Sequence, residues 1–306
     1  MQNATGLSIL SAADLLAADI APRDELLGPL LASDTAALVY GPAGIGKSFF
    51  ALSIAWAVAG GGSFLGWKSA RPHRVLYVDG EMGGVSLRER VRLFGPPPAG
   101  LALSAHDLGG GPILDLTQDL GLKRLMAAWD DPELVVLDTL SSLAGLRSGD
   151  PEHWDRLQRF LLHQRKHRRA LLLVHHTNKA GKMRGTTRRE DAVDLVIALR
   201  HPEGRAGQGT RAGNARFEIH VEKLRRRSGL SLAPVLAALE TDESGRAEWR
   251  WGRPDAGRFE KAVAVLRRGL TARDAAAALG VSRTTLFRLK AEARAKGLLR
   301  PGGSLS

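Results

Sequence analysis

Short apolar runs alternate with helical stretches through the middle of the chain. Five runs of four or five residues are nearly continuous in apolar character: Ala36–Tyr40, Val75–Asp79, Leu134–Leu137, Leu171–Val174 and Leu195–Leu199. Strands have this pattern when helices cover both faces of a parallel sheet. The alternation therefore predicts βαβ units around a mostly parallel central sheet, an α/β fold.

The hydrophobic pattern changes in the next part of the chain. Arg216–Val221 alternates, with Phe217 and Ile219 on one face, which predicts a half-exposed antiparallel strand. Two further segments, Leu230–Leu236 and Ala247–Trp251, predict strands that extend the same edge of the sheet.

The domain boundaries follow from breaks in these patterns. Pro254 and the glycines on either side of it interrupt the strand pattern, and a helical pattern follows. We therefore predict an N-terminal lead-in over residues 1–33 with a short helix at Ala12–Ala18. An α/β domain follows over 34–252, and a small all-α domain over 253–306.

Charge and composition narrow the class of function. The chain has 306 residues with a net charge of +12, and residues 253–306 hold 12 Lys/Arg against 4 Asp/Glu, a net charge of 12 − 4 = +8. This excess favours a polyanionic partner, nucleic acid before membrane. There is no cysteine, which excludes disulfides, thiolate metal sites and cysteine nucleophiles. The most apolar stretch, Phe49–Ala59, is shorter than the roughly 20 residues that span a bilayer, so we expect a soluble, cytoplasmic protein with no membrane partner.

A phosphate-binding loop follows the first strand. The sequence from Gly41 to Ser48 matches the phosphate-loop pattern at every fixed position, and a predicted helix, Ser48–Val58, follows it. Lys47 would reach the β- and γ-phosphates, and the Ser48 hydroxyl would ligate Mg²⁺. The alternative is a glycine-rich turn before a buried helix. The predicted ATP-binding residues are Gly41, Pro42, Ala43, Gly44, Ile45, Gly46, Lys47, Ser48 and Phe49.

Two other predicted strands end in acids. Asp138 follows an apolar run and could hold Mg²⁺ through water beside Ser48; otherwise it caps the next turn. Glu81 follows the strand that ends at Asp79 and could orient and deprotonate the attacking water. Asp79 is the competing base, and either acid could instead pair with nearby arginines.

A histidine pair ends another predicted strand. His175 and His176 follow the apolar run Leu171–Val174, and His176 is the better candidate for sensing the γ-phosphate. The alternatives are a structural role or a metal site. No third ligand lies at a suitable spacing nearby, which argues against zinc.

The order of these motifs resembles that of a RecA-type ATPase. The phosphate loop, Tyr77-Val-Asp-Gly-Glu81, Val135-Val-Leu-Asp-Thr-Leu140 and Val174-His-His176 are most similar to RepA-type hexameric replicative helicases, from about Leu15 to Arg227. The resemblance implies ATP and Mg²⁺ as ligands, with Lys47, Glu81, Asp138 and His176 as the catalytic set. It also implies a homo-oligomer, such as a hexamer, with ATP sites between subunits.

The resemblance further implies basic residues that act beyond the chain's own site. The candidates for completing a neighbour's site are Arg90, Arg184, Lys223 and Arg225, each of which could instead be a solvated surface charge. The loop after His176 carries Lys179 and Lys182, and in RecA-like proteins the corresponding loop contacts single-stranded DNA.

The C-terminal segment predicts a helix-turn-helix. Thr271 and Asp274 form a capping-box pattern, Gly280 can end the first helix, and Ser282 can cap the second. The outward residues that would contact duplex DNA are Arg283, Thr284, Thr285 and Arg288. The alternative is a helical bundle that packs on the ATPase ring. RepA-type helicases do not require this module, so it is a departure from their pattern.

These observations favour a DNA-binding ATPase in replication, repair or mobile-element maintenance, with helicase activity as one form of it. The competing hypothesis is an ATP-switched DNA-binding regulator with slow turnover. A small-molecule kinase fits poorly, because it leaves the basic C-terminal segment unexplained.

Overall fold

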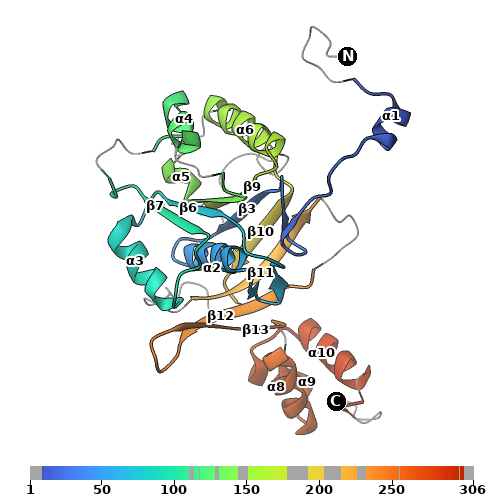
Figure 1. Cartoon of the computed structure of the whole chain (residues 1–306). Helices are drawn as coiled ribbons and strands as arrows, with labels where there is room; N and C mark the ends of the chain where they lie inside the picture. Colours follow the sequence, from blue (N-terminus) through green and yellow to red (C-terminus); the bar gives the residue numbers. More distant parts are fainter. Residues whose placement is uncertain are drawn as a thin grey trace.

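The computed structural model describes residues 9–109, 114–116, 118–127, 131–143, 151–177, 192–202, 215–225, 232–254, 256–295 and 297–299. A nine-stranded sheet forms the centre of this described part, in the order β13-β12-β11-β10-β3-β9-β8-β6-β7 (Figure 1). Its strands are β3 (Ala36–Gly41), β6 (Val75–Asp79), β7 (Leu101–Ala105), β8 (Leu134–Asp138), β9 (Ala170–His176), β10 (Leu195–Arg200), β11 (Ala215–Leu224), β12 (Val235–Thr241) and β13 (Ala247–Gly252).

The strands from β10 to β7 run parallel, and β11, β12 and β13 extend the sheet antiparallel. This confirms the α/β fold with a mostly parallel sheet. The burial pattern of β11 is typical of an antiparallel strand with one exposed face. Ala215, Phe217 and Ile219 are buried, and the residues between them are more exposed.

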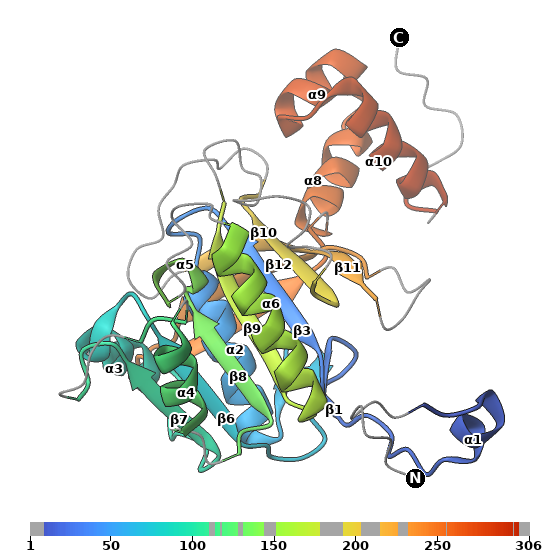
Figure 2. The ribbon, with the colours of Figure 1, turned by 90° about the horizontal axis from the view of Figure 1, so that it is seen from above.

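Helices cover both faces of the sheet (Figure 2). One core cluster packs α2 and α3 on alternate strand residues such as Val39 and Tyr77. The other packs α4, α5 and α6 on the residues between them, such as Leu38 and Val78. The helices are α1 (Ala12–Ala17), α2 (Lys47–Gly60), α3 (Gly83–Leu93), α4 (Asp119–Ala127), α5 (Leu140–Leu143), α6 (Pro151–Lys166), α8 (Ala256–Arg267), α9 (Ala272–Leu279) and α10 (Arg283–Ala295).

Three differences from the predicted strands have physical causes. The pattern analysis missed β7, an edge strand in which Ala102 and Ser104 are exposed, so its apolar signal is weak. The strand predicted at Leu230–Leu236 overlaps the observed strand only at its end, since β12 begins at Val235. Two short hairpins, β1 (Glu25–Leu27) with β2 (Leu31–Ala32) and β4 (Ser63–Phe64) with β5 (Trp67–Lys68), carry too few residues for a pattern.

An aromatic cluster joins α2 to the antiparallel edge. The Phe50 ring makes edge contacts with the rings of Phe64 and Phe217, at centroid distances of 5.4 and 5.9 Å. The Trp249 indole donates a hydrogen bond of 2.8 Å to the Ser53 hydroxyl on α2. The helix that follows the phosphate loop is therefore held from β13 as well as from the central strands.

The two ends of the chain carry helical elements outside the sheet. The N-terminal segment with α1 stands away from the body in Figures 1 and 2. Ser11 and Asp14 form a capping box at its start. At the other end α8, α9 and α10 pack on one another, so a helical C-terminal region is present as expected.

Candidate nucleotide site

The phosphate loop connects β3 to α2 and depends on two glycines. Gly44 and Gly46 have φ angles of 72° and 107°, which side chains rarely adopt. A Cβ atom on Gly46 would also lie 2.6 Å from the Cβ of Ala215 on β11. The loop can therefore form only with glycine at this position, close to the neighbouring strand.

The Lys47 side chain folds back onto the phosphate loop. Its buried ammonium donates hydrogen bonds to the carbonyl oxygens of Gly41 and Pro42, at 3.0 and 2.9 Å, and lies 3.1 Å from His176 Nδ1. Desolvation by burial lowers the pKa of Lys47 to about 8, although the charges of Asp138 and Glu81 oppose the shift. Bound phosphates would bring anionic charge, which favours the protonated ammonium.

The parallel strands bring the predicted site residues to one edge of the sheet. Gly41 is in register with His176 on β9, and Asp79 with Asp138 on β8. A cavity of about 160 Å³ opens at this edge. Its lining residues are Gly44, Gly46, Lys47, Ser48, Phe49, Asp79, Glu81, Met82, Arg90, Asp138, Thr139 and His176.

Glu81 and His176 form a polar pair inside this cavity. The Glu81 carboxylate lies 3.2 Å from His176 Nε2 and accepts a hydrogen bond of 3.1 Å from the Thr139 hydroxyl. Desolvation acts to raise the pKa of Glu81. The hydrogen bonds and charges of His176, Thr139 and Lys47 outweigh it and lower the pKa below its usual value. The two nitrogens of His176 thus contact Lys47 on one side and Glu81 on the other.

Asp79, the competing base, is engaged elsewhere. Its carboxylate accepts hydrogen bonds from the backbone N–H groups of Met82 and Gly83, at 3.0 and 2.8 Å. It therefore holds the first turn of α3, and the geometry favours Glu81 as the carboxylate that faces a water.

Asp138 is buried next to Ser48 and fits a role beside a metal ion. Tyr77 donates a hydrogen bond of 2.5 Å to its Oδ2, while Oδ1 is buried without a hydrogen-bond partner among the described residues. Burial raises the pKa of Asp138, and hydrogen bonds from Tyr77 and Ser48 oppose this rise. An orphaned carboxylate oxygen beside a hydroxyl is a suitable environment for a hydrated Mg²⁺.

The donor set does not form a protein cage for a metal. In the part of the chain that the structure describes, no three His, Cys, Asp or Glu side chains converge as ligands. Ser48 and Asp138 would therefore hold Mg²⁺ together with phosphate oxygens and water, as Mg²⁺ sites in nucleotide enzymes do.

Arg90, one of the candidates for completing a neighbour's site, lines the cavity of its own chain. Its guanidinium lies over the Phe49 ring, 4.7 Å from the centroid, and lines the chain's own cavity. The cause is the short connection from Glu81 to α3, whose last turn returns toward the phosphate loop. Arg90 thus lies at the cavity of its own chain, and its role at a neighbour's site stays a prediction.

The other predicted basic residues lie away from this cavity or outside the described residues. Lys223 pairs with Val196 at the amino end of β10, on the sheet edge opposite the phosphate loop. Arg225 lies beside it, with its guanidinium 3.8 Å from Asp194. Arg184, Lys179 and Lys182 are outside the described residues.

The C-terminal helices have the predicted caps. The Thr271 hydroxyl accepts a hydrogen bond from Asp274 N at 3.2 Å, and Gly280 ends α9 with a φ angle of 61°. Arg283, Thr284 and Arg288 are exposed on α10. The Thr285 N–H donates to the Ser282 hydroxyl at 3.2 Å, and the two hydroxyl oxygens lie 2.9 Å apart.

Two residues near these sites, Tyr77 and Phe287, escaped the sequence analysis, and Arg90 was expected in a different role. Tyr77, which donates to Asp138, looks like any apolar strand residue in the pattern. The cavity role of Arg90 depends on the turn that follows Glu81. Phe287 is exposed on α10 one turn after Arg283, and its place beside outward basic residues was the available signal.

The chain is similar to known proteins in sequence and in structure. The chain is 27% identical to the DNA repair protein RadA of Brucella abortus (strain 2308) over 194 residues, which are 61% of this chain and 37% of RadA. The chain thus spans well under half the length of this curated relative. The structure also matches the KaiC-like protein PH0186 of Pyrococcus horikoshii OT3, at 17% identity and a TM-score of 0.49, over 73% of this chain and 93% of that one. No described helix has both the length and the apolar character that a membrane crossing requires.

A protein-family model also matches the chain. Residues 4–182, more than half of the chain, match the family described as AAA domain. This match includes the phosphate loop, Glu81, Asp138 and His176, and together with the likeness to RadA it supports a RecA-like P-loop ATPase. The extent of the match shows that the chain belongs to the AAA domain family.

Proposed function

We propose that this chain is a DNA-associated ATPase that hydrolyses ATP with Mg²⁺ at the cavity between the phosphate loop and Glu81. The observation that carries the proposal is the position of His176, whose two ring nitrogens lie 3.1 Å from Lys47 Nζ and 3.2 Å from Glu81 Oε2. One side chain thus connects the phosphate-binding cation to the carboxylate that would face the attacking water.

Each residue of the cavity has a separate role in the proposed ATP hydrolysis. The loop N–H groups and Lys47 would bind the β- and γ-phosphates, and Ser48 and Asp138 would hold Mg²⁺, which supplies positive charge for the phosphate oxygens. Glu81 is ionised at neutral pH because its pKa is lowered, so it can orient a water molecule and accept its proton. Arg90 lines the same cavity and would bring a second positive charge to the phosphates.

His176 would report the state of the γ-phosphate. A bound phosphate would attract the Lys47 ammonium, so the contacts of Lys47 with the carbonyl oxygens of Gly41 and Pro42 and with His176 would change. His176 ends β9 and precedes the predicted DNA loop with Lys179 and Lys182. Nucleotide turnover would therefore alter the loop that we expect to contact single-stranded DNA.

The assembly we propose is a homo-oligomer with shared ATP sites, of which the RepA-type hexamer is one form. Lys223 and Arg225 lie at the opposite end of the sheet from their own phosphate loop, so they could reach only a neighbour's site. Arg184 is a further candidate for this role.

The test is the steady-state ATPase rate with no DNA, with single-stranded DNA and with duplex DNA. Lys47→Ala should abolish activity, whereas the matched exposed variant Lys68→Ala should leave it unchanged. Stimulation by single-stranded DNA of about tenfold, or about 1.4 kcal/mol of coupling, would support a motor and justify an unwinding assay. Activity that survives in Lys47→Ala would refute the site assignment.

A second function is favoured by the basic helical region at the C-terminus. Residues 253–306 hold +8 of the net +12 charge, and α8, α9 and α10 pack mainly on one another. In this hypothesis the region is a separate domain that binds a duplex site, and slow ATP turnover switches it. Duplex binding that changes with ATP would favour this regulator. The binding should fall in Arg288→Glu and persist in the distant variant Arg92→Glu. A slow ATPase indifferent to DNA would argue against the helicase.

A further inference from the structure

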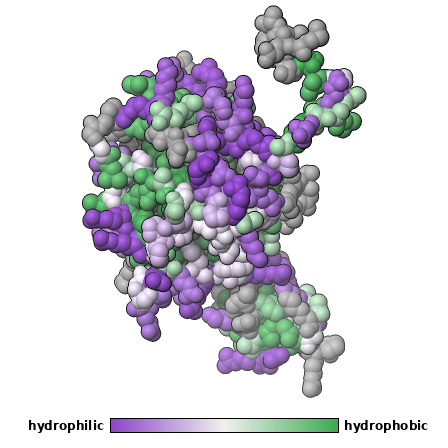
Figure 3. All heavy atoms as spheres, in the orientation of Figure 1, coloured by the Kyte–Doolittle hydropathy of each residue, from purple (hydrophilic) through white to green (hydrophobic). Residues whose placement is uncertain are grey.

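Phe287 is a large aromatic residue on the outside of α10. It is 53% exposed, whereas Leu286 and Leu289 on the same helix are fully buried. The core cluster that joins the C-terminal helices contains Leu286 with Ala275 and Ala276 of α9, and Phe287 is not among its described members. In Figure 3 hydrophobic residues reach the surface of this region, at the lower right. The Phe287 ring is therefore available for contact with another molecule.

Phe287 belongs to one stripe of α10. Thr284, Phe287, Arg288 and Ala291 follow the i, i+3, i+4, i+7 spacing that places side chains on one face of a helix, and all four are exposed. We refer to these four residues as the outer stripe. The buried residues of α10 lie on the opposite face. The outer stripe extends about 10 Å along the helix axis, which corresponds to about three base pairs of duplex DNA.

The outer stripe has little capacity for hydrogen bonds to bases. Arg288 can donate two hydrogen bonds to a guanine, and the Thr284 hydroxyl can donate or accept one. Phe287 has no polar group in its side chain, and Ala291 presents only a methyl group, which lets the helix approach the base edges closely. The apolar group that the major groove offers is the C5 methyl group of thymine. The outer stripe is therefore suited to contact with thymine methyl groups.

Basic residues follow one edge of the outer stripe. Arg283, Lys290 and Arg294 are spaced by seven and four residues, which places them on the same side of α10. Burial and the charge of Arg294 lower the pKa of Lys290, so an anion at this edge would relieve the repulsion between them. Glu292 lies on the other edge, where its charge would repel a phosphate. These charges favour a position of α10 in which the basic edge faces one phosphate strand.

The start of α10 is held by its cap. The Ser282 hydroxyl accepts a hydrogen bond from the Thr285 N–H at 3.2 Å. In helix-turn-helix proteins the N-terminal residues of the second helix contact the base edges. Thr284, Phe287 and Arg288 all lie in the first two turns of α10, so they have the position along the helix that such contacts require.

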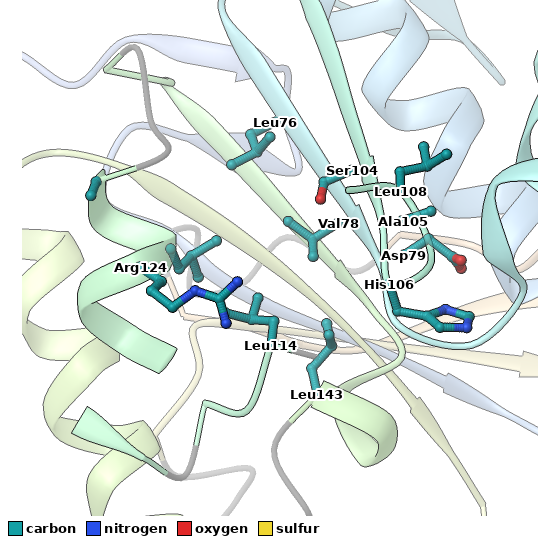
Figure 4. A pocket seen from close by; sticks show the side chains of 12 residues that line it. Leu76, Val78, Asp79, Ser104, Ala105, His106, Leu108, Leu114, Arg124 and Leu143 are labelled. Atoms are coloured by element: carbon teal, nitrogen blue, oxygen red, sulfur yellow. The ribbon is translucent and has the colours of Figure 1, made fainter. Parts of the chain in front are cut away.

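Leu108 is a similarly exposed apolar residue with different surroundings. It is 61% exposed and lines a cavity of about 420 Å³ at the β7 edge of the sheet, whose walls are mostly aliphatic (Figure 4). Asp79 and Arg124 both line this cavity, so its charges do not favour an anionic partner. Phe287 differs, because Arg288 is next to it in sequence and a basic edge runs along the same helix. These surroundings favour nucleic acid as the partner of Phe287.

We infer that Phe287 contacts the C5 methyl groups of thymine in the major groove, so that the duplex site of this chain contains thymine opposite the outer stripe. The inference rests on the second function proposed above, duplex binding by the C-terminal region, and not on ATP hydrolysis. It names the chemical group that the region selects and the side chain that selects it.

The test compares thymine with uracil in a duplex that the full chain selects. Random-sequence duplexes are first selected for binding to the wild-type chain at physiological salt, and the selected duplex is then made with thymine or with uracil. Uracil pairs as thymine does and lacks only the C5 methyl group. The wild type should bind the thymine duplex about fourfold more tightly for each methyl group that it contacts, which is the effect expected from burying one such carbon group.

Variants of Phe287 assign this preference to one side chain. Phe287→Ala should bind the thymine and uracil duplexes equally, and Phe287→Leu should keep part of the preference because it keeps an apolar contact. The matched control is Leu162→Ala, which removes a 55% exposed apolar side chain from α6 and should keep the full preference. Thermal unfolding of all three variants should match that of the wild type, because both positions are exposed.

The possible failures are distinguishable. Equal binding of the two duplexes by the wild type would overturn the inference, as would a preference that survives in Phe287→Ala or selected duplexes that lack thymine. Duplex binding that is indifferent to the methyl group would refute this inference alone. A full chain that binds no duplex would refute the second proposed function and the inference together.

Discussion

Lys47 carries the most informative titration in the molecule. Burial lowers the pKa of Lys47 from its ordinary value of 10.5 to about 8. Bound phosphates supply negative charge and should raise this pKa again. At about pH 9 most of the empty sites hold a neutral Lys47, so ADP binding without Mg²⁺ should take up close to one proton. At about pH 7 the lysine is already charged, and uptake should be near zero.

Calorimetry in buffers of different ionisation enthalpy measures this uptake. The Lys68→Ala chain, altered at an exposed lysine, should take up protons as the wild type does. Equal proton uptake at the two pH values would contradict the assignment of the buried ammonium to the phosphate site.

Glu133 makes a prediction about stability rather than binding. Desolvation acts to raise its pKa. Bonds from the His73 ring, the Arg74 N–H and the Arg71 guanidinium outweigh this and lower the pKa to about 2. A lowered carboxyl pKa contributes stability that is present above about pH 4.5 and is lost as the pH falls toward 2. We expect Glu133→Gln to cost about 2 kcal/mol at neutral pH, because the 26% exposure of the side chain limits the effect.

Urea unfolding at two pH values tests the role of Glu133. The difference between wild type and Glu133→Gln should shrink toward zero near pH 2, while Glu243→Gln, in an exposed turn, should show little difference at either pH. A cost that stays constant with pH would indicate packing rather than charge.

At the scale of elements, the strands that carry the site were the easiest to predict. Strands such as β3 and β8 are buried on both faces, so their apolar runs are continuous and the polar residue at each carboxyl end stands out. Edge strands lack this signal, as the exposed residues of β7 show. The roles of Tyr77 and Arg90 depend on which side chains meet across the sheet and after a turn, and a single sequence does not contain that information.

The end of α9 provides an element-scale prediction. Gly280 has a φ angle of 61°, and no described atom lies within 4 Å of where its Cβ would be. Gly280→Ala should therefore act through backbone strain alone and cost about 1 kcal/mol. Hydrogen exchange should show faster opening of α9 and α10 with unchanged protection of α2. Equal loss of protection in α2 would contradict a separate C-terminal domain over 253–306.

At the scale of the whole molecule, the decisive question is whether one chain completes its own ATP site. The cavity holds Lys47, Glu81 and Arg90 from one chain, whereas Lys223 and Arg225 lie at the far end of the sheet. A head-to-tail assembly is the arrangement in which such residues could reach a neighbouring phosphate site. In such an assembly the basic residues would complete the neighbour's site.

Mixing two inactive variants distinguishes an ATP site that neighbouring chains share from one that a single chain completes. Lys47→Ala chains lack phosphate binding but keep the basic pair, and Lys223→Ala/Arg225→Ala chains have the reverse defect. Each variant alone should be inactive.

Random mixing at equal amounts should restore about a quarter of the wild-type rate, because one interface in four pairs two intact halves. If the double variant is fully active on its own, the site is complete within one chain and these two residues play no part in a neighbour's catalysis.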